Sequence, residues 1–237
     1  MKITERLFSY FSKGEILLWL TSVFLIVGAF CVFDRGNYLT LAASLIGVTS
    51  IIINAKGNPL GQFLMIIFSL LYGVISFSFA YYGEMVTYLG MTMPMSIFAL
   101  VSWLRHPYKG KWSEVEIKRI EKKEAMVMFL LAGAVTVAFY FILSEFHTAN
   151  IVPSTASVTT SFLAVYLTYK RSPYFSIAYA LNDVVLVVLW VLASMENTTY
   201  ISVVVCFVAF LLNDIYGFIS WSKMEKRQNH LNQRGKK

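Results

Sequence analysis

Eight long apolar segments separated by short polar gaps dominate this chain of 237 residues. As helices, such segments can cross the roughly 30 Å hydrocarbon core of a membrane, which takes about 20 residues. Only 14% of the residues are charged, whereas soluble domains average about 25%. The sequence therefore predicts an all-α integral membrane protein that forms a single membrane domain, with eight transmembrane helices at residues 15–33, 38–55, 59–82, 85–104, 125–146, 150–169, 173–194 and 198–222.

The basic residues are confined to alternate gaps between these segments. All but one of the 20 Lys and Arg residues lie at the two termini or in the second, fourth and sixth gaps, and the exception is Arg35. Cytoplasmic loops collect Lys and Arg, so both termini are expected in the cytoplasm, with residues 223–237 as a basic tail. The net charge of +7 follows from this topology, and because no basic face is free of the lipid bilayer, no nucleic-acid partner is expected.

Two parts of the chain resemble each other. Lys56 and Lys170 each stand three residues before a proline that opens the next segment, and they are 114 residues apart. Trp103 and Trp221 each end a segment and are 118 residues apart. Matches in the same order at nearly constant spacing indicate duplication. The predicted architecture is 1+3+1+3, in which two parallel three-helix repeats follow an extra N-terminal helix and are joined by a linker helix: 15–33 (extra helix), 38–104 (first repeat), 125–146 (linker) and 150–222 (second repeat).

Catalysis has no support in the sequence. The chain contains no HExxH, GxSxG or P-loop motif, and its three histidines lie in predicted loops or in the tail. We therefore expect no catalytic residue, no metal site and no cofactor. Parallel repeats that enclose a site at mid-membrane are instead a transporter design.

Two Asn-Asp pairs occur in apolar surroundings, Asn182-Asp183 in the seventh segment and Asn213-Asp214 in the eighth. These are the only acids that we place deep within a predicted span. A charge at mid-bilayer costs roughly 2.5–3.5 kcal/mol, so these side chains should face the bundle interior or a watery cavity. A substrate pathway is the favoured interpretation. Interhelical hydrogen bonds worth about 0.6 kcal/mol each, or a protease-like carboxyl dyad, are the alternatives.

Aromatic and polar side chains recur at helical spacing near these acids and suit a ligand with a flat ring and polar appendages. Pro94 should kink the fourth helix and free a backbone carbonyl. Trp190 lies toward the outer face as an interfacial or a gating residue. The substrate-binding set predicted on this basis is Gln62, Tyr72, Tyr88, Thr92, Tyr179, Asn182, Asp183, Trp190, Asn213, Asp214 and Tyr216.

Two further features are expected at the cytoplasmic side. Trp103 and Trp221 are predicted to be interfacial belt residues, because they sit at helix ends beside basic residues. Residues 113–124 are predicted to form a short amphipathic surface helix in which Glu114 and Lys118 pair at a spacing of four.

The stretch LYGVISFSFAYYGEMVTYLGMTMPMSIFALVSW, from Leu71 to Trp103, and the matching FLLNDIYGFISW that ends at Trp221 resemble the PnuC-type nicotinamide riboside transporters. The resemblance implies a 3+1+3 fold similar to that of the SWEET sugar transporters, and a homotrimer in the bacterial inner membrane. It also implies uptake of a vitamin precursor by facilitated diffusion, followed by trapping through a cytoplasmic kinase that phosphorylates the substrate.

One motif of this family is missing. Nicotinamide riboside transporters carry a Trp-x-x-Trp pair early in the helix that matches the seventh segment, where this chain reads YFSIAY from Tyr174 to Tyr179. Phe175 and Tyr179 would then supply the stacking surface, which adds Phe175 to the expected binding residues. Nicotinamide riboside is the favoured substrate, with a deoxynucleoside, thiamine or riboflavin as alternatives, and a non-transporting receptor or scaffold as the competing class.

Overall fold

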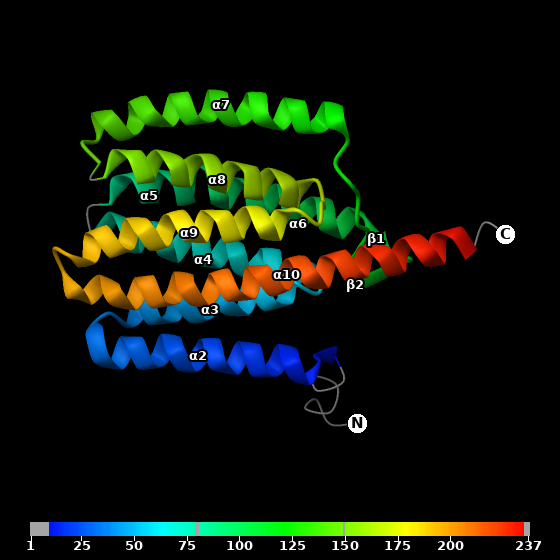
Figure 1. The fold of residues 1–237 in the computed structure, drawn as a ribbon, viewed down its shortest axis with the longest axis horizontal. Helices are drawn as coiled ribbons and strands as arrows, with labels where there is room; N and C mark the ends of the chain where they lie inside the picture. Colours follow the sequence, from blue (N-terminus) through cyan, green and yellow to red (C-terminus); the bar gives the residue numbers. More distant parts are fainter. Residues whose placement is uncertain (1–9, 79–80, 149, 235–237) are drawn as a thin grey trace.

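The computed structural model describes residues 10–78, 81–148 and 150–234, which form one elongated bundle of helices lying side by side (Figure 1). Within these residues eight helical paths follow one another: α2 (Lys13–Phe33), α3 (Tyr38–Asn54), α4 (Pro59–Ser78), α5–η1–α6 (Tyr82–Thr87, Tyr88–Thr92, Met93–Arg105), α7 (Lys122–Glu145), α8 (Ile151–Tyr169), α9 (Phe175–Ser194) and η2–α10 (Thr198–Tyr200, Ile201–Arg234).

Seven of these helical paths in the described residues are long and apolar enough to cross a membrane, and α3, with 17 residues, is shorter. The outermost helices α2 and α7 bury only 22% and 17% of their most apolar stretches inside the protein. Their apolar side chains therefore face outward, as expected for an all-α membrane protein whose surrounding solvent is lipid.

One end of the bundle gathers the basic residues. The α3–α4, α6–α7 and α8–α9 connections and both ends of the described chain meet there, at the right of Figure 1. We call this the basic end; Arg35 lies at the opposite end, after α2. Four residues that contribute to the charge pattern, Lys2, Arg6, Lys236 and Lys237, lie outside the described residues.

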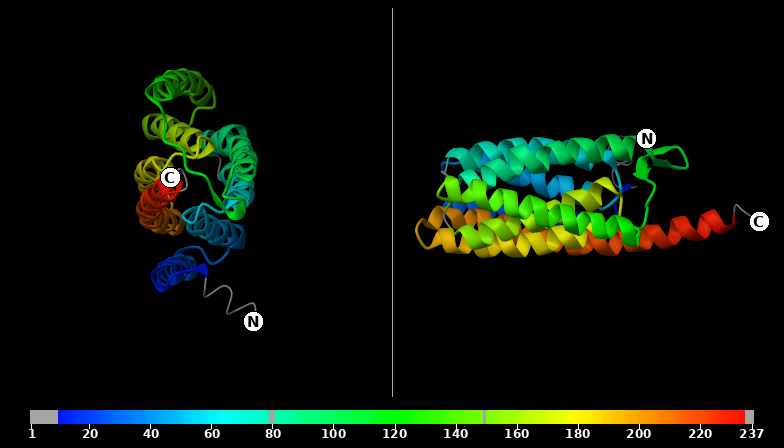
Figure 2. Two further views of the ribbon diagram at one scale, coloured as in Figure 1. Left: turned by 90° about the vertical axis from the view of Figure 1, so that its right-hand side faces the viewer. Right: turned by 90° about the horizontal axis from the view of Figure 1, so that it is seen from above.

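Helices α2 and α7 flank the bundle on opposite sides (Figures 1 and 2). Both begin with a capping box, in which the side chain of the residue before the helix and the glutamate three positions later satisfy each other's backbone N–H groups. In α2 these residues are Ser12 and Glu15, and in α7 they are Glu121 and Glu124. Each flanking helix therefore starts at a point fixed by its own sequence.

The predicted surface helix at 113–124 is wrong. A two-stranded hairpin, β1 (Pro107–Tyr108) and β2 (Lys111–Val115), stands in its place and is followed by irregular chain up to α7. The turn of this hairpin has positive φ at Lys109 (50°) and Gly110 (74°), and it brings Lys111–Val115 back along β1 as an antiparallel strand.

The charged pair expected in that helix is also absent. Glu114 bonds to Arg227 on α10, and Lys118 bonds to Glu124 instead (3.3 Å). The spacing of four between Glu114 and Lys118 is compatible with a helix, but Glu114 lies in β2 with a partner 113 residues away, and the Lys118 N–H donates to the carbonyl of Arg171 (3.1 Å) rather than within a helix.

The belt prediction for Trp103 and Trp221 is wrong as well. Both indoles are fully buried, and their ring centroids are 5.3 Å apart. Trp103 Nε1 donates to the carbonyl of Thr168 at the end of α8 (2.9 Å), and Trp221 Nε1 donates to the carbonyl of Asn54 at the end of α3 (2.8 Å). Each of these carbonyls also accepts a backbone N–H, from Arg171 at Thr168 (3.0 Å) and from Gly57 at Asn54 (2.8 Å), so each indole supplies a second donor and satisfies its own buried N–H group.

Two helices depart from their predicted form. Helix α10 does not end near residue 222 but continues to Arg234, so the first part of the predicted tail is helical. In the fourth span, Pro94 follows a π turn, Tyr88–Thr92, in which the Met93 N–H bonds to the Tyr88 carbonyl five residues earlier. A single widened turn absorbs the disturbance that a proline causes in a helical ladder.

Candidate functional site

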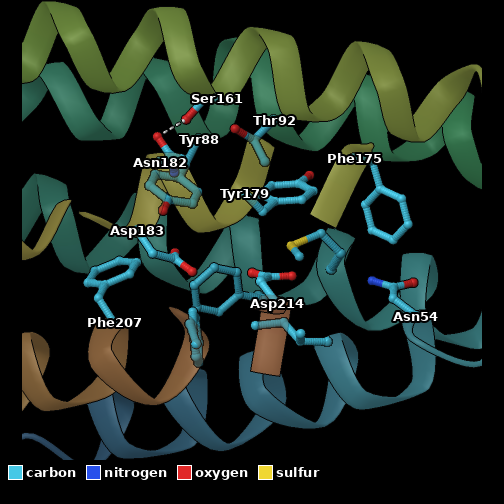
Figure 3. A pocket seen from close by; sticks show the side chains of 14 residues that line it. Asn54, Tyr88, Thr92, Ser161, Phe175, Tyr179, Asn182, Asp183, Phe207 and Asp214 are labelled. Carbon is cyan, nitrogen blue, oxygen red and sulfur yellow. Dashed lines mark hydrogen bonds between the residues drawn. The ribbon is translucent and has the colours of Figure 1, made fainter. Parts of the chain in front are cut away.

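A pocket lies inside the bundle where α3, α4, η1, α8, α9 and α10 meet (Figure 3). Its cavity volume is about 30 Å³, which is room for one or two water molecules. Side chains from both ends of the sequence close around it: Ile51, Asn54, Met65, Phe68, Tyr88, Thr92, Ser161, Phe175, Tyr179, Asn182, Asp183, Phe207, Phe210 and Asp214.

Asp183 on α9 and Asp214 on α10 are the charged residues of this lining. They are 3% and 4% exposed and close enough to interact directly. Asp183 Oδ2 has no hydrogen-bond partner in the described part of the chain. Two buried carboxyl groups in contact, one with a free acceptor, form a site that a ligand with a positive charge or hydrogen-bond donors would satisfy.

Asn182 is held in a fixed orientation beside them. Its Oδ1 accepts hydrogen bonds from Thr160 Oγ1 (2.8 Å) and Ser161 Oγ (3.0 Å), both on α8. Because these hydroxyls engage the oxygen, the NH₂ group is the part of the side chain left to donate to a ligand. The dashed line in Figure 3 marks the bond to Ser161.

Aromatic rings stand on both sides of the carboxyl pair. Phe175 and Tyr179 of α9 have ring centroids 6.2 Å apart and lie toward the basic end. On the other side Phe68 packs against Tyr88 (5.8 Å) and Phe210 (5.5 Å). Stacking between such rings is favourable for a planar heterocycle, while the polar groups fix its orientation.

Five of the twelve predicted residues do not line the pocket. Asn213 and Tyr216 face α2: Asn213 Nδ2 donates to Ser22 Oγ (2.7 Å), and Tyr216 donates to Glu15 Oε1 (2.8 Å). Successive residues of a helix point about 100° apart, so Asp214 faces the pocket while Asn213 turns to the neighbouring helix.

Gln62, Tyr72 and Trp190 lie just behind the pocket. Gln62 Nε2 donates to Asn54 Oδ1 (2.9 Å), and the ring centroids of Tyr72 and Tyr88 are 4.5 Å apart. Trp190 is fully buried against Tyr81 (4.8 Å), farther from the basic end. It is therefore not an interfacial belt residue, and it belongs to the packing between the pocket and the opposite end.

Three comparisons with known proteins agree. Residues 37–223 match the model of a family described as nicotinamide mononucleotide transporter. The chain belongs to this transporter family. It is therefore a membrane transporter and not an enzyme.

A curated relative, the nicotinamide riboside transporter PnuC of Neisseria mucosa, is 25% identical over 218 residues, which cover 90% of this chain and 82% of that protein. The crystal structure of the vitamin B3 transporter PnuC superposes with a TM-score of 0.80 at 22% identity, covering 92% of this chain and 94% of that one. This likeness shows a PnuC-like fold.

Several lining residues carry no signal in the sequence that marks them as binding residues. Asn54 and Ser161 are small polar residues at which nothing in the pattern pointed to a ligand. Phe68, Phe207 and Phe210 are indistinguishable from lipid-facing phenylalanines until the packing is known. A helical-wheel comparison with Asp214 could have found Phe207 and Phe210, which lie seven and four residues earlier on the same helix face.

Another buried acid, Glu84, lies at the start of the fourth helical path. Glu84 was placed in a gap, but α5 begins at Tyr82, and Glu84 is 2% exposed within it. Its Oε1 accepts from Ser157 Oγ of α8 (3.0 Å). Glu84 is buried in the first turn of α5 rather than deep in the span, and it is not among the residues that line the pocket.

Proposed function

We propose that this transporter carries nicotinamide riboside across the bacterial inner membrane by facilitated diffusion, with the basic end and both termini in the cytoplasm. A cytoplasmic kinase would then trap the substrate by phosphorylation. The basic residues at one end of the bundle support the proposed orientation in the membrane. The chemistry of the pocket and the name of the Neisseria relative support the proposed substrate.

The observation that carries the substrate proposal is the pairing of aromatic walls with two carboxyl groups. Asp183 and Asp214 are the charged residues among the described ones that line the pocket, which contains no Lys or Arg there. Nicotinamide riboside has a planar pyridinium ring with a positive charge and a ribose with several hydroxyls. A carboxylate offsets the cation, the rings stack with it, and Asn182 bonds to the sugar.

The charge of the pocket also predicts how well other substrates should bind. Nicotinamide mononucleotide adds a phosphate that two carboxyl groups would repel, so the nucleoside should be preferred over the mononucleotide. Thiamine is also a flat cation and is the strongest competitor. Riboflavin and deoxynucleosides are neutral and gain nothing from the carboxyl pair.

The cavity of about 30 Å³ is far smaller than the 300–1,000 Å³ of typical ligand pockets, so Phe68, Tyr88, Phe207 and Phe210 must move apart to admit a nucleoside. Transport therefore needs a state in which the aromatic wall is open. A rigid receptor or scaffold has no need of such a state.

Uptake of radiolabelled nicotinamide riboside into liposomes that contain the purified protein tests the proposal. We expect saturable influx that stops at equal concentrations inside and outside, with no proton or sodium gradient. Unlabelled thiamine should compete weakly, and nicotinamide mononucleotide should not compete. Absence of saturable flux for the nucleoside would remove the substrate proposal, and dependence on an ion gradient would remove facilitated diffusion.

We further propose that the helices divide as 1+3+1+3, with repeats at 38–104 and 150–222, and that three chains associate. The crossed Trp103 and Trp221 contacts support the duplication, and the poorly buried face of α7 provides lipid-exposed surface for association. Native mass spectrometry of the protein in mild detergent should give a trimer mass, and a monomer would contradict this part.

A further inference from the structure

The segment after α6 ties the basic end of the molecule together. We call residues 106–121, which include β1 and β2, the strap. The Val115 N–H donates to the carbonyl of Gly57 in the α3–α4 connection (2.9 Å), and the Lys118 N–H donates to the carbonyl of Arg171 in the α8–α9 connection (3.1 Å). Val115 is fully buried. The strap thus joins the loops of the two predicted repeats.

The strap also holds the last turns of α10. The Ile117 N–H donates to Gln228 Oε1 (2.9 Å), and Gln228 Nε2 donates to the carbonyl of Val115 (3.0 Å). Arg119 forms an ion pair with Glu225, whose side chain is 10% exposed. An opening at the basic end that moves α10 away from the strap must break these bonds.

A second, larger cavity of about 370 Å³ lies between the strap, the α3–α4 connection and α10. Three cationic side chains, Lys56, Lys223 and Arg227, line it together with one carboxylate, Glu114. Arg227 pairs with Glu114, and Lys56 pairs with Glu15 at the start of α2 (3.1 Å). Cations therefore outnumber the carboxylate in the lining.

Lys223 is the exposed cation of this lining that has no ion-pair partner in the described part of the chain. Beside it, Ser113 contributes a hydroxyl group, whereas the Tyr10 hydroxyl donates to the Ser113 carbonyl (3.4 Å). The Lys56 Nζ lies 5.3 Å from the centroid of the Tyr10 ring. An unpaired ammonium group beside a hydroxyl donor, in a cavity of ligand size, is suited to binding a phosphate group.

We propose that this cavity binds a phosphate-bearing anion and that the bound anion holds the basic end closed. The phosphate bridges Lys223 of α10, Lys56 of the α3–α4 connection and the hydroxyl of Ser113 on the strap. A ligand that touches three elements which must separate binds the closed state better than the open one, and so shifts the population toward closure. This second step rests on the proposed transport function, whereas the binding step does not.

Binding is tested on the full-length protein in a nonionic detergent, by thermal shift and calorimetry. The probes are inorganic phosphate and adenosine 5′-monophosphate, with chloride at equal ionic strength as the reference. We expect both probes to raise the melting temperature of the wild type by mass action. Lys223→Gln should weaken binding roughly tenfold, while Lys226→Gln, also an exposed lysine of α10 but outside the cavity, should leave it unchanged.

A second arm distinguishes the source of the phosphate. Protein in vesicles of phosphatidylcholine alone is compared with protein in vesicles that contain phosphatidylglycerol. Stabilisation by the anionic lipid that Lys223→Gln abolishes assigns the site to a lipid headgroup, and stabilisation by the soluble probes assigns it to a free phosphate compound. Equal weakening by Lys223→Gln and Lys226→Gln, or no stabilisation in either arm, overturns the site.

Closure is tested separately in liposomes loaded with adenosine 5′-monophosphate. The internal anion should slow nicotinamide riboside influx through the wild type several-fold and leave Lys223→Gln unaffected. Probe binding without any nucleoside flux would leave the site in place and refute the proposed function. Flux that the internal anion does not slow, with binding intact, would refute the closure step.

Discussion

The two halves of the bundle are alike at the basic end and unlike in the pocket. Trp103 of the first half bonds to the end of α8 in the second, and Trp221 of the second bonds to the end of α3 in the first. The serines that precede these tryptophans repeat the pattern. Ser102 Oγ donates to the carbonyl of Tyr169 (3.0 Å), and Ser220 Oγ donates to the carbonyl of Ala55 (2.7 Å).

The flanking helices extend this likeness. Glu15, which caps α2, binds Lys56 in the first half (3.1 Å), and Glu124, which caps α7, binds Lys170 in the second (2.9 Å). At the basic end α2 and α7 therefore hold equivalent places. The predicted architecture gives these two helices different roles, as the extra N-terminal helix and as the linker.

The pocket breaks the likeness. Asn182, Asp183 and Asp214 all belong to α9 and α10, whereas α4 in the first half contributes Met65 and Phe68. The contacts that hold the basic end together occur in both halves, whereas both charged residues of the pocket lining belong to the second half. Closure and recognition can therefore change independently, and mutations in the two regions should have separable effects.

The largest expected effect is loss of either buried tryptophan. Trp103→Ala and Trp221→Ala each remove a fully buried indole and its hydrogen bond, and each should destabilise the protein by roughly 3–5 kcal/mol. Thermal unfolding in detergent, monitored by size-exclusion chromatography, should show similar losses of stability for both variants. Trp112→Ala is the control, because Trp112 is 70% exposed. A large loss in only one of the two variants would contradict the equivalence of the halves.

Substitution of the acids should affect transport more than stability. Asp183→Asn and Asp214→Asn keep the side-chain volume but remove the charge that offsets a pyridinium ring, so kcat/KM for nicotinamide riboside should fall at least roughly tenfold, or about 1.4 kcal/mol. Initial influx rates into liposomes measure this effect. Asn213→Ala is the matched control, since Asn213 bonds to Ser22 and should lower stability without raising KM. Unchanged transport in both acid variants would show that the pair is structural.

A smaller effect should distinguish the two glutamate–lysine pairs. The Glu15 side chain is 3% exposed and that of Glu124 is 22% exposed. Lys56→Met leaves a buried carboxylate without its cation and should cost roughly 1–3 kcal/mol. Lys170→Met should cost about 1 kcal/mol or less. Melting temperatures of the two variants at low and high salt measure the difference. A greater loss of stability for Lys170→Met than for Lys56→Met would contradict the prediction from burial.

The smallest effect concerns Asp34, which follows α2 at the end opposite the basic end. Burial raises the pKa of its carboxyl, and its bond with Ser202 opposes that shift. A raised folded-state pKa means that stability is greatest below the unfolded-state value and falls as pH rises through the folded-state value. Asp34→Asn should therefore be slightly more stable than the wild type at pH 7 but not at pH 3.5. Equal melting temperatures at both pH values would contradict the shift.

The sequence was informative where one property of a residue decides its place. Charge alternation predicted the order and direction of the helices, because transferring Lys or Arg into lipid is costly wherever it occurs. Asp183 was assigned to the interior for the same reason, and it lines the pocket.

Other placements depended on partners far along the chain. Asn213 and Asp214 are equivalent by composition, and only the packing of α2 decides which of them faces the pocket. Trp221 beside basic residues is typical of an interfacial belt, and its true acceptor lies 167 residues away. The conformation of the strap also depends on distant partners, because Glu114 bonds to Arg227 on α10 and not to Lys118 four residues later.

The π turn at Tyr88–Thr92 gives the fourth helical path one residue more than a regular helix needs for the same span. Removing that residue, for example by deletion of Gly90, would restore the regular ladder and rotate everything before it by about 100° relative to α6. Glu84 would then lose its bond with Ser157. The extra residue therefore acts as a fixed angular offset, which allows one continuous helix to present Thr92 to the pocket and a carboxyl group to α8.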